Sequence, residues 1–333
     1  MLSTDTNIAA SILEDPSWRR AWSLAERLSP FRETANSAQT FDAELAAEIL
    51  ALWRASSPFD KGSYFADRLA MDGLTEEEFR RLLGTPAEIL GGSGPAPAWV
   101  QILARAYSAP AISPDLAPAH WGDVASHPHA GFLNLVRPLM SDARRRLQAR
   151  VDRIRQEHPA APFDPARAVD AMFANLPASL LRMVAKTMVL ELQVARLEGV
   201  LQGNTPAERF ADFTERLSRP GLALKLLSEY PVLARRLVES AENWISFSAE
   251  FLQRLAADWN EIVRIFNFGP QCGALVEAAA GAGDTHRRGR SVLIARFEGG
   301  LQLVYKPRCI AVDEHFQEFI RWVNEKGANP QLR

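Results

Sequence analysis

The chain has 333 residues, of which 47% are hydrophobic and 23% are charged, and its 38 basic and 40 acidic side chains leave a formal charge of −2. These values are typical of globular proteins and exclude disordered, collagen-like and low-complexity classes. A nearly neutral chain also has no general attraction to nucleic acid, so we expect no nucleic-acid partner.

Membrane and disulfide-rich classes are excluded by local sequence. The weakly polar stretches 183–194 and 273–282 contain charged residues and are shorter than the ~20 apolar residues that a membrane span requires. Acidic residues stand where a signal peptide would be basic and apolar, which favours a cytoplasmic location. With only Cys272 and Cys309, neither a disulfide framework nor a cysteine-built zinc site is expected, and both thiols are predicted to be reduced and buried.

Most of the first 265 residues have the period of amphipathic helices. A capping box predicts a helix that starts at Thr75, because the Thr75 hydroxyl and the Glu78 carboxylate can each accept an N–H at the helix terminus. This helix is predicted to end at Gly84. Residues 91–97 and 108–118 are rich in glycine or proline and predict connections. An earlier apolar stripe is predicted from Leu45, Ile49, Leu52 and Trp53.

The segment 139–156 predicts a long amphipathic helix, because apolar residues recur on one side of it. That apolar stripe consists of Leu147, Val151 and Ile154. Around it lie arginines at positions 144, 145, 146, 150, 153 and 155. Two interpretations remain open: a solvated helix face, or a basic surface that docks an acidic peptide, since charge alone does not identify a partner.

Further helices are predicted over 179–201, from about residue 221, and over 231–266. Between the first two, Thr205 has the features of an N-cap followed by proline at the first helical position, and Glu208 completes a second capping box.

The pattern changes after Pro270. Residues 291–297 are rich in β-branched and aromatic side chains, 298–300 form a turn, and 301–306 alternate with period two, which predicts a β-hairpin. On the second strand, alternation points Leu301, Leu303 and Tyr305 to one face and Gln302, Val304 and Lys306 to the other. After Pro307, an amphipathic helix is predicted from Phe316, Phe319, Ile320 and Val323.

The segment 281–290, just before the hairpin, combines three glycines with ionisable side chains. Successive N–H groups of such a loop can hold phosphate oxygens, and a lysine on a rigid strand can reach them, as in the small lobe of kinases. The segment and Lys306 therefore predict a phosphate site. The alternative is an ordinary turn beside a solvated edge-strand lysine.

At these residues the chain resembles a known family. Residues 283–292 (Gly-Asp-Thr-His-Arg-Arg-Gly-Arg-Ser-Val) and 304–308 (Val-Tyr-Lys-Pro-Arg) look like the dehydratase domain of class II lanthipeptide synthetases. The segments 201–210 and 230–235 match the family's helical section, so that the resemblance is firm from Leu201 onward and loose before it.

The resemblance implies a two-step activity. Members of the family use ATP and Mg²⁺ to phosphorylate Ser and Thr of a precursor peptide, and then eliminate the phosphate to give dehydroalanine or dehydrobutyrine. A C-terminal zinc domain then cyclises the product. The resemblance thus implies ATP and Mg²⁺ as cofactors, and a precursor peptide with a leader and a Ser/Thr-rich core as partner.

The resemblance also assigns residues. Lys306 is implied in phosphorylation, and Asp284 and His286 in phosphate elimination, where one of the two transfers a proton. Gly283, Gly289 and Arg308 are candidate contacts for the ATP phosphates. A following-helix carboxylate, Glu314 or Glu318, is a candidate partner for Lys306. Each residue also has a plain structural interpretation, as a turn, loop or surface residue.

The implied fold is α+β and predominantly helical. A long helical region, 1–200, leads into residues 201–333, which hold a helical section and the beginning of a lipid-kinase-like small lobe with an antiparallel hairpin and a helix. The kinase catalytic loop and its metal-binding Asp would follow Lys306 and that helix. We therefore expect a chain truncated before the catalytic loop and without the zinc cyclase, and the corresponding hypothesis is that the chain alone is inactive.

Two functions remain as alternatives. The chain is either the N-terminal fragment of a lanthipeptide dehydratase, or a non-catalytic peptide- or nucleotide-binding module that acts with a separately encoded catalytic part. No metal ligand is assigned: His120, His127 and His129 lie close together in sequence, but only Asp123 accompanies them as a carboxylate, which favours a histidine-rich loop without metal.

Overall fold

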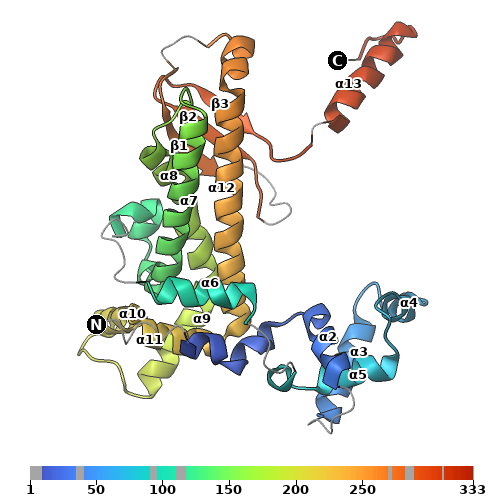
Figure 1. Ribbon diagram of the computed structural model, residues 1–333, viewed down its shortest axis with the longest axis vertical. Coiled ribbons are helices and arrows are strands. Elements are labelled where there is room, and N and C mark those ends of the chain that lie inside the picture. The colour runs from blue at the N-terminus through green and yellow to red at the C-terminus, as the bar shows by residue number, and fades with distance from the viewer. Residues whose placement is uncertain are drawn as a thin grey trace. The chain divides into compact units, whose positions relative to one another are not determined.

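The computed structural model describes residues 10–34, 41–90, 96–109, 118–268, 272–281, 289–309 and 311–332. This part of the chain is mostly helical, with one small antiparallel sheet near the C-terminus (Figure 1), which confirms the predicted α+β class. The chain forms two compact units. The first comprises 1–145 and 176–242, and the second comprises 146–175 and 243–333. The division at residue 200 stays a prediction.

The first unit is built from helices alone in its described residues. Its elements are η1 (Pro16–Ala21), α2 (Leu24–Thr34), α3 (Ala43–Ala55), α4 (Tyr64–Met71), α5 (Glu76–Gly84), η2 (Ala87–Ile89), α6 (Ala98–Tyr107), η4 (Pro118–Ser126), η5 (Ala130–Val136), the first part of α7 (Arg137–Glu157), α9 (Asn175–Leu197) apart from its first residue, α10 (Pro206–Leu217), α11 (Pro220–Glu229) and the first part of α12 (Pro231–Phe266).

Both predicted capping boxes are confirmed. At the start of α5, the Thr75 hydroxyl accepts the Glu78 N–H at 3.2 Å and the Glu78 carboxylate accepts the Thr75 N–H at 2.8 Å. The same exchange between Thr205 and Glu208 begins α10. Because the first N–H groups of a helix have no partner within it, these side chains fix where the two helices begin.

The apolar stripe predicted for α3 is only partly right. Ala46 and Leu50 are buried, and Ile49 and Trp53 pack against the same core. Leu45 and Leu52, however, are 46% and 67% exposed. Because α3 carries Ala or Leu on nearly every side, its sequence is compatible with more than one buried face, and contacts with α4 and α5 select one.

The second unit contains the sheet. Its elements are the last part of α7, α8 (Pro165–Phe173), the last part of α12, β1 (Leu275–Ala280), β2 (Leu293–Phe297), β3 (Gln302–Tyr305) and α13 (Ala311–Glu325). The predicted hairpin is confirmed as β2 and β3, whereas β1 was not predicted. The strand order is β1-β2-β3 and both pairings are antiparallel.

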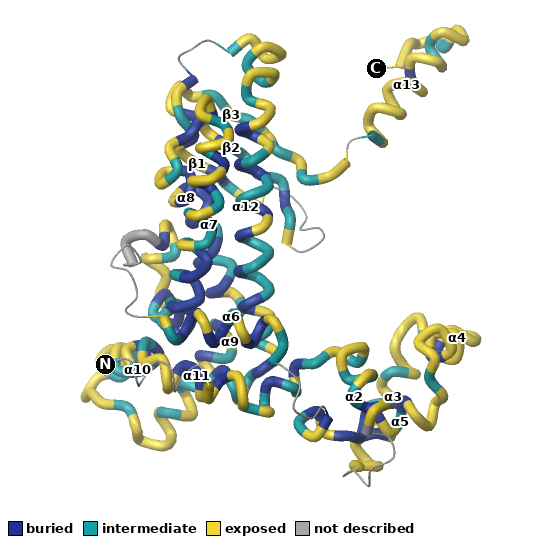
Figure 2. The backbone as a smooth tube through the Cα atoms, viewed as in Figure 1, coloured by how far each residue is buried: buried dark blue, intermediate teal, exposed yellow. Residues whose placement is uncertain are grey.

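One face of the sheet packs on helices of the second unit. Leu293 pairs with Tyr305 and Ala295 with Leu303, and these side chains share a core with α7, α8 and α12. Figure 2 shows buried residues along the strands and the facing parts of these helices, and mostly exposed residues along α13. Burial of such apolar side chains contributes roughly 1.5–3 kcal/mol each, so this core holds the sheet in place.

The two cysteines differ in environment. Cys272 is buried, as predicted, but Cys309 is exposed, so the prediction is wrong for that residue. Cys309 follows β3 at a position where the chain has left the sheet core, and local sequence did not indicate this. Among the described helices, none is long and apolar enough to cross a membrane.

Candidate functional site

Lys306 directly follows β3 and is exposed. Alternation along β3 partly buries Leu303 and Tyr305 and exposes Gln302 and Val304, as the sequence predicted, and Lys306 just after the strand is exposed as well. Val304 is 59% exposed and pairs with Ile294 of β2. We call the side of the sheet that carries Ile294, Val304 and Lys306 its open face. It presents an ammonium group beyond two adjacent aliphatic side chains.

The other charges of the open face neutralise each other. Glu277 of β1 and Arg296 of β2 are register partners and form an ion pair at 2.8 Å. Lys306, by contrast, forms no ion pair within the described residues, and Glu318 instead lies 3.3 Å from His315. Lys306 is therefore the charge on this face that remains available to an anionic ligand.

Arg308 has a protein partner. Its guanidinium donates to the Asp313 carboxylate at 3.0 Å, and both side chains are about half exposed. Exposed pairs of this kind contribute only about 0–1 kcal/mol, so a phosphate group could replace Asp313 at small cost. The role of Arg308 as a phosphate contact stays a prediction.

The residues that flank the glycine-rich segment are anchored on both sides. Gly281 donates its N–H to the hydroxyl of the buried Ser291 at 2.9 Å, and Ala280 donates to Asn175 Oδ1 at 3.0 Å. Gly283, Asp284 and His286 lie outside the described residues. The described residues on either side of them, Gly281 and Ser291, are joined by this hydrogen bond.

Gly289 stands at the re-entry of this segment with a φ of +80°, a conformation that favours glycine. Four residues later, Leu293 pairs with Tyr305, the residue before Lys306. The end of the glycine-rich segment and Lys306 are thus attached to neighbouring ends of adjacent strands.

A charged network from α12, which sequence reasoning did not detect, holds this end of the sheet. Glu250 forms an ion pair with Arg290 and another with Arg254 at 3.0 Å. The Tyr305 hydroxyl accepts from Arg254 at 2.8 Å and donates to Glu250 at 3.3 Å. Burial, followed by the charge of Glu250, raises the pKa of Tyr305, so its hydroxyl keeps its proton and remains a donor.

The β2–β3 turn is held from the opposite side of the hairpin. The Glu298 carboxylate accepts the Ala274 N–H at 3.0 Å and pairs with Arg167 at 2.7 Å, and these contacts, the backbone one first, lower the pKa of Glu298. Gly273, with φ +69°, passes so close that an added Cβ would lie 2.6 Å from Glu298 Cβ. The strand that leads to Lys306 is therefore fixed at both ends.

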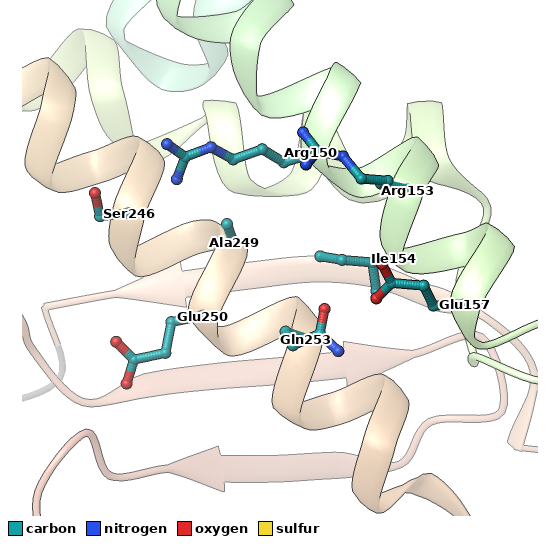
Figure 3. Close-up of a pocket in the computed structure, with 8 residues that line it drawn as sticks. All are labelled: Arg150, Arg153, Ile154, Glu157, Ser246, Ala249, Glu250 and Gln253. Carbon is teal, nitrogen blue, oxygen red and sulfur yellow. The ribbon is translucent and has the colours of Figure 1, made fainter.

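The same α12 helix lines a groove on its side facing α7 (Figure 3), with a volume of about 530 Å³. Glu250 points away from the groove toward the sheet, whereas Arg150 extends from α7 toward α12. The groove residues of each helix are spaced i, i+3, i+4 and i+7, which is one helical face. They are Arg150, Arg153, Ile154 and Glu157 of α7, and Ser246, Ala249, Glu250 and Gln253 of α12.

The histidine-rich loop has no group of ligands at metal spacing within the described residues. His127 Nδ1 accepts the His129 N–H at 3.1 Å, and the His129 ring stacks on Phe132 with centroids 5.2 Å apart. The side chain of His120 lies outside the described residues. The two described histidines thus have structural contacts of their own.

A known family matches the part of the chain that carries Lys306, and one known protein is similar to part of the chain. Residues 230–333 match the family described as "Domain of unknown function (DUF4135)". The chain is 23% identical over 146 residues to "Lacticin 481/lactococcin biosynthesis protein LcnDR2" of Lactococcus lactis subsp. lactis. That match covers 44% of this chain and 15% of the relative. Over these residues the chain is therefore similar to a lacticin 481/lactococcin biosynthesis protein, which agrees with the resemblance noted in the sequence.

Proposed function

We propose that the chain supplies the nucleotide-binding part of a lanthipeptide dehydratase, an enzyme that phosphorylates Ser and Thr of a precursor peptide and then eliminates the phosphate. The observation that carries the proposal is Lys306, a lysine without an ion pair among the described residues, on the open face beside Val304 and Ile294. The similarity to a lacticin 481/lactococcin biosynthesis protein supports a role in lantibiotic biosynthesis.

The residues on this face suit ATP. An ammonium group attracts phosphate oxygens, and the exposed Val304 with its half-buried pair partner Ile294 offers an apolar surface to a base. Bound ATP with Mg²⁺ supplies the transferable phosphoryl group. Lys306 would hold the phosphate oxygens while the peptide hydroxyl oxygen forms a bond to the γ-phosphorus and loses its proton. The bond from that phosphorus to the bridging oxygen of ADP would break and ADP would leave, and charge compensation at the phosphate oxygens would favour this transfer.

Elimination requires a different set of groups. Asp284 and His286 are proposed to act here, one of them accepting the α-proton of the phosphorylated residue. The Cα–H bond breaks, a Cα=Cβ double bond forms, and the Cβ–O bond breaks with its electron pair leaving on phosphate. The attachment of their segment at Gly281 and Ser291, next to the strand pair that leads to Lys306, supports a shared site for both steps.

Nucleotide binding tests the proposal directly. We expect the chain to bind a fluorescent ATP analogue, and Lys306→Ala to weaken binding by roughly 10- to 100-fold, because a hydrogen bond to a charged group contributes about 1.5–3 kcal/mol. The control is Lys186→Ala, which removes an exposed lysine of α9. Equal affinities of wild type and Lys306→Ala would overturn the assignment.

The two chemical steps are separated by mass spectrometry of the peptide. In the active dehydratase, Lys306→Ala should abolish the gain of phosphate mass, whereas His286→Ala or Asp284→Ala should let phosphorylated peptide accumulate without loss of water. Full dehydration by any of these variants would refute the role given to that residue.

A further inference from the structure

The groove between α7 and α12 is open because α12 presents small side chains to it. Ser246 and Ala249 lie on the α12 wall, and the long side chain of Arg150 extends toward them from α7 (Figure 3). Ile154 forms an apolar part of the lining and is itself buried. The groove is therefore lined by both polar and apolar side chains.

The structure distinguishes two of the six arginines at positions 144 to 155 of α7. Arg145 pairs with Asp142 at 2.6 Å and Arg155 donates to the Ala161 carbonyl at 2.6 Å. Arg144 and Arg146 also have partners within the chain. Arg150 and Arg153 make no hydrogen bond or ion pair to any described residue, and both line the groove. Two uncompensated guanidinium groups therefore lie one helical turn apart at the same hollow.

Acidic groups of the groove do not cancel this charge. Glu250 is already engaged by Arg254 and Arg290 and points toward the sheet. Glu157 lies one turn beyond Arg153, at the other end of the lining. The groove is therefore cationic at the Arg150 end and acidic at the Glu157 end. Arg150 is half-buried, which strengthens its interaction with an anion relative to a fully exposed arginine.

We propose that this groove binds an acidic peptide segment whose carboxylates pair with Arg150 and Arg153. The distance from residue 150 to residue 157 along α7 is about 10 Å, which is the length of roughly three extended residues and exceeds one phosphate ion. Carboxylates of the segment lie at the Arg150 end, and neutral or basic residues lie beside Glu157. The Ser246 hydroxyl is available to the peptide backbone. This inference does not depend on the proposed dehydratase reaction.

A short fluorescein-labelled peptide tests the groove, with two glutamates at one end and alanines and a lysine at the other. Binding to the full chain is measured by fluorescence anisotropy at low and high salt. We expect Arg150→Gln combined with Arg153→Gln to weaken binding roughly tenfold, because two ion pairs to the peptide are lost and each is partly exposed to solvent. Ser246→Trp keeps both arginines but fills the hollow, and should weaken binding similarly.

A matched control separates the groove from general surface charge. Arg182→Gln combined with Arg196→Gln removes the same charge from exposed positions of α9 and should leave the affinity unchanged. Circular dichroism of every variant checks that the fold is retained. The proposal is wrong if wild type does not bind, if the α9 control loses as much affinity, or if Ser246→Trp binds normally. Selective binding of a phosphoserine peptide in place of the glutamate peptide would also overturn it.

Discussion

Asp142 illustrates how a single buried carboxylate connects two helices. Its side chain is 2% exposed, and it accepts from Arg105 of α6 at 2.8 and 3.2 Å and from Arg145 of α7 at 2.6 Å. The two arginines are 45% and 67% exposed. The carboxylate therefore depends on its partners to compensate for lost hydration, whereas each arginine can return to water.

This asymmetry predicts unequal effects of substitution. Asp142→Ala removes every bond of the network and should lower the free energy of unfolding by about 2 kcal/mol. Arg145→Gln leaves Asp142 with its paired bonds to Arg105 and should cost less than about 1 kcal/mol. Urea denaturation followed by circular dichroism measures both, and equal losses would contradict the interpretation of Asp142 as the dependent partner.

At the same scale, the sequence predicted the exposure of Lys306, whereas it did not predict the groove. That exposure continues the period-two alternation of β3, which is a local property. The selection of Arg150 and Arg153 depends on which neighbouring arginines find partners, such as Asp142 for Arg145 and the Ala161 carbonyl for Arg155. The bonds from Glu250 to Arg290 and Tyr305 span 40 and 55 residues, and no local pattern encodes such separations.

At the scale of elements, capping residues and hydrophobic periodicity predicted where helices lie, but they did not predict strand β1. Its sequence, Leu-Val-Glu-Ala-Ala-Ala, is rich in residues that favour helices. A bulge between Leu275 and Glu277 also interrupts alternation, so that the buried residues Leu275 and Ala278 are three apart. Strand formation here is imposed by pairing with β2 and by packing on α8, which are tertiary contacts.

Helix α5 contains a glycine that alanine should not replace, despite alanine's higher helix propensity. A Cβ on Gly84 would lie 2.4 Å from the Asp42 carbonyl oxygen and 2.6 Å from the Phe41 ring. The chain cannot easily move apart there, because the Asp42 N–H donates to the Gly84 carbonyl at 2.9 Å. We expect Gly84→Ala to lower the thermal midpoint, with a cost of about 1–3 kcal/mol.

Gly221 provides the matched comparison for Gly84. It lies in α11, and nothing approaches an added Cβ within 4 Å. Gly221→Ala should therefore raise stability by up to about 1 kcal/mol through helix propensity alone. A gain of stability in both variants would show that the contact between α5 and residues 41–42 is not tight.

The capping box of α10 predicts a pH dependence. The Glu208 carboxylate accepts the N–H groups of Thr205 and Asn204, and these bonds lower the pKa of Glu208 below its ordinary value of 4.5. A carboxyl whose pKa is lower in the folded state stabilises the fold fully above its unfolded pKa. That contribution is lost as the pH falls through the folded pKa.

Glu208→Gln should therefore be less stable than wild type at neutral pH, and the difference should shrink as the pH falls below 4.5. Thermal denaturation of both proteins across this range measures the effect. The control is Glu215→Gln in the same helix. The Glu215 carboxylate pairs with Arg219 at 3.6 Å. A difference that stays constant with pH would exclude the charged capping bond as its source.

At the scale of the whole molecule, neither compact unit is a continuous stretch of chain. Helices α7 and α12 each contribute residues to both units, and the chain passes between the units three times. The region matched by the known family, 230–333, contains the whole sheet but not the segment 146–175 that belongs to the same unit. The boundary of the sequence family is therefore not the boundary of the folded unit.

The segment 146–175 covers one face of the sheet and bonds to its edge. Val151, Ile154 and Val169 share the core with Leu293 and Phe297. At the edge, the Pro162 carbonyl accepts the Leu275 N–H at 2.8 Å, and the Asn175 side chain bonds to Ala278 and Ala280 at 2.7 and 3.0 Å. A sheet without this segment would expose its apolar face and leave polar groups of β1 unpaired.

We therefore expect a fragment of residues 230–333 not to fold, although it includes every residue of the family match. It should lack a cooperative thermal transition and be cleaved rapidly by protease, whereas the full chain resists cleavage of β1–β3. Addition of a separate peptide of residues 137–175 should restore protection of the strands, because it returns the core residues of α7 and α8 and the bonds to β1. A fragment that melts cooperatively alone would show instead that α12 suffices to stabilise the sheet, and that the site around Lys306 forms independently of α7 and α8.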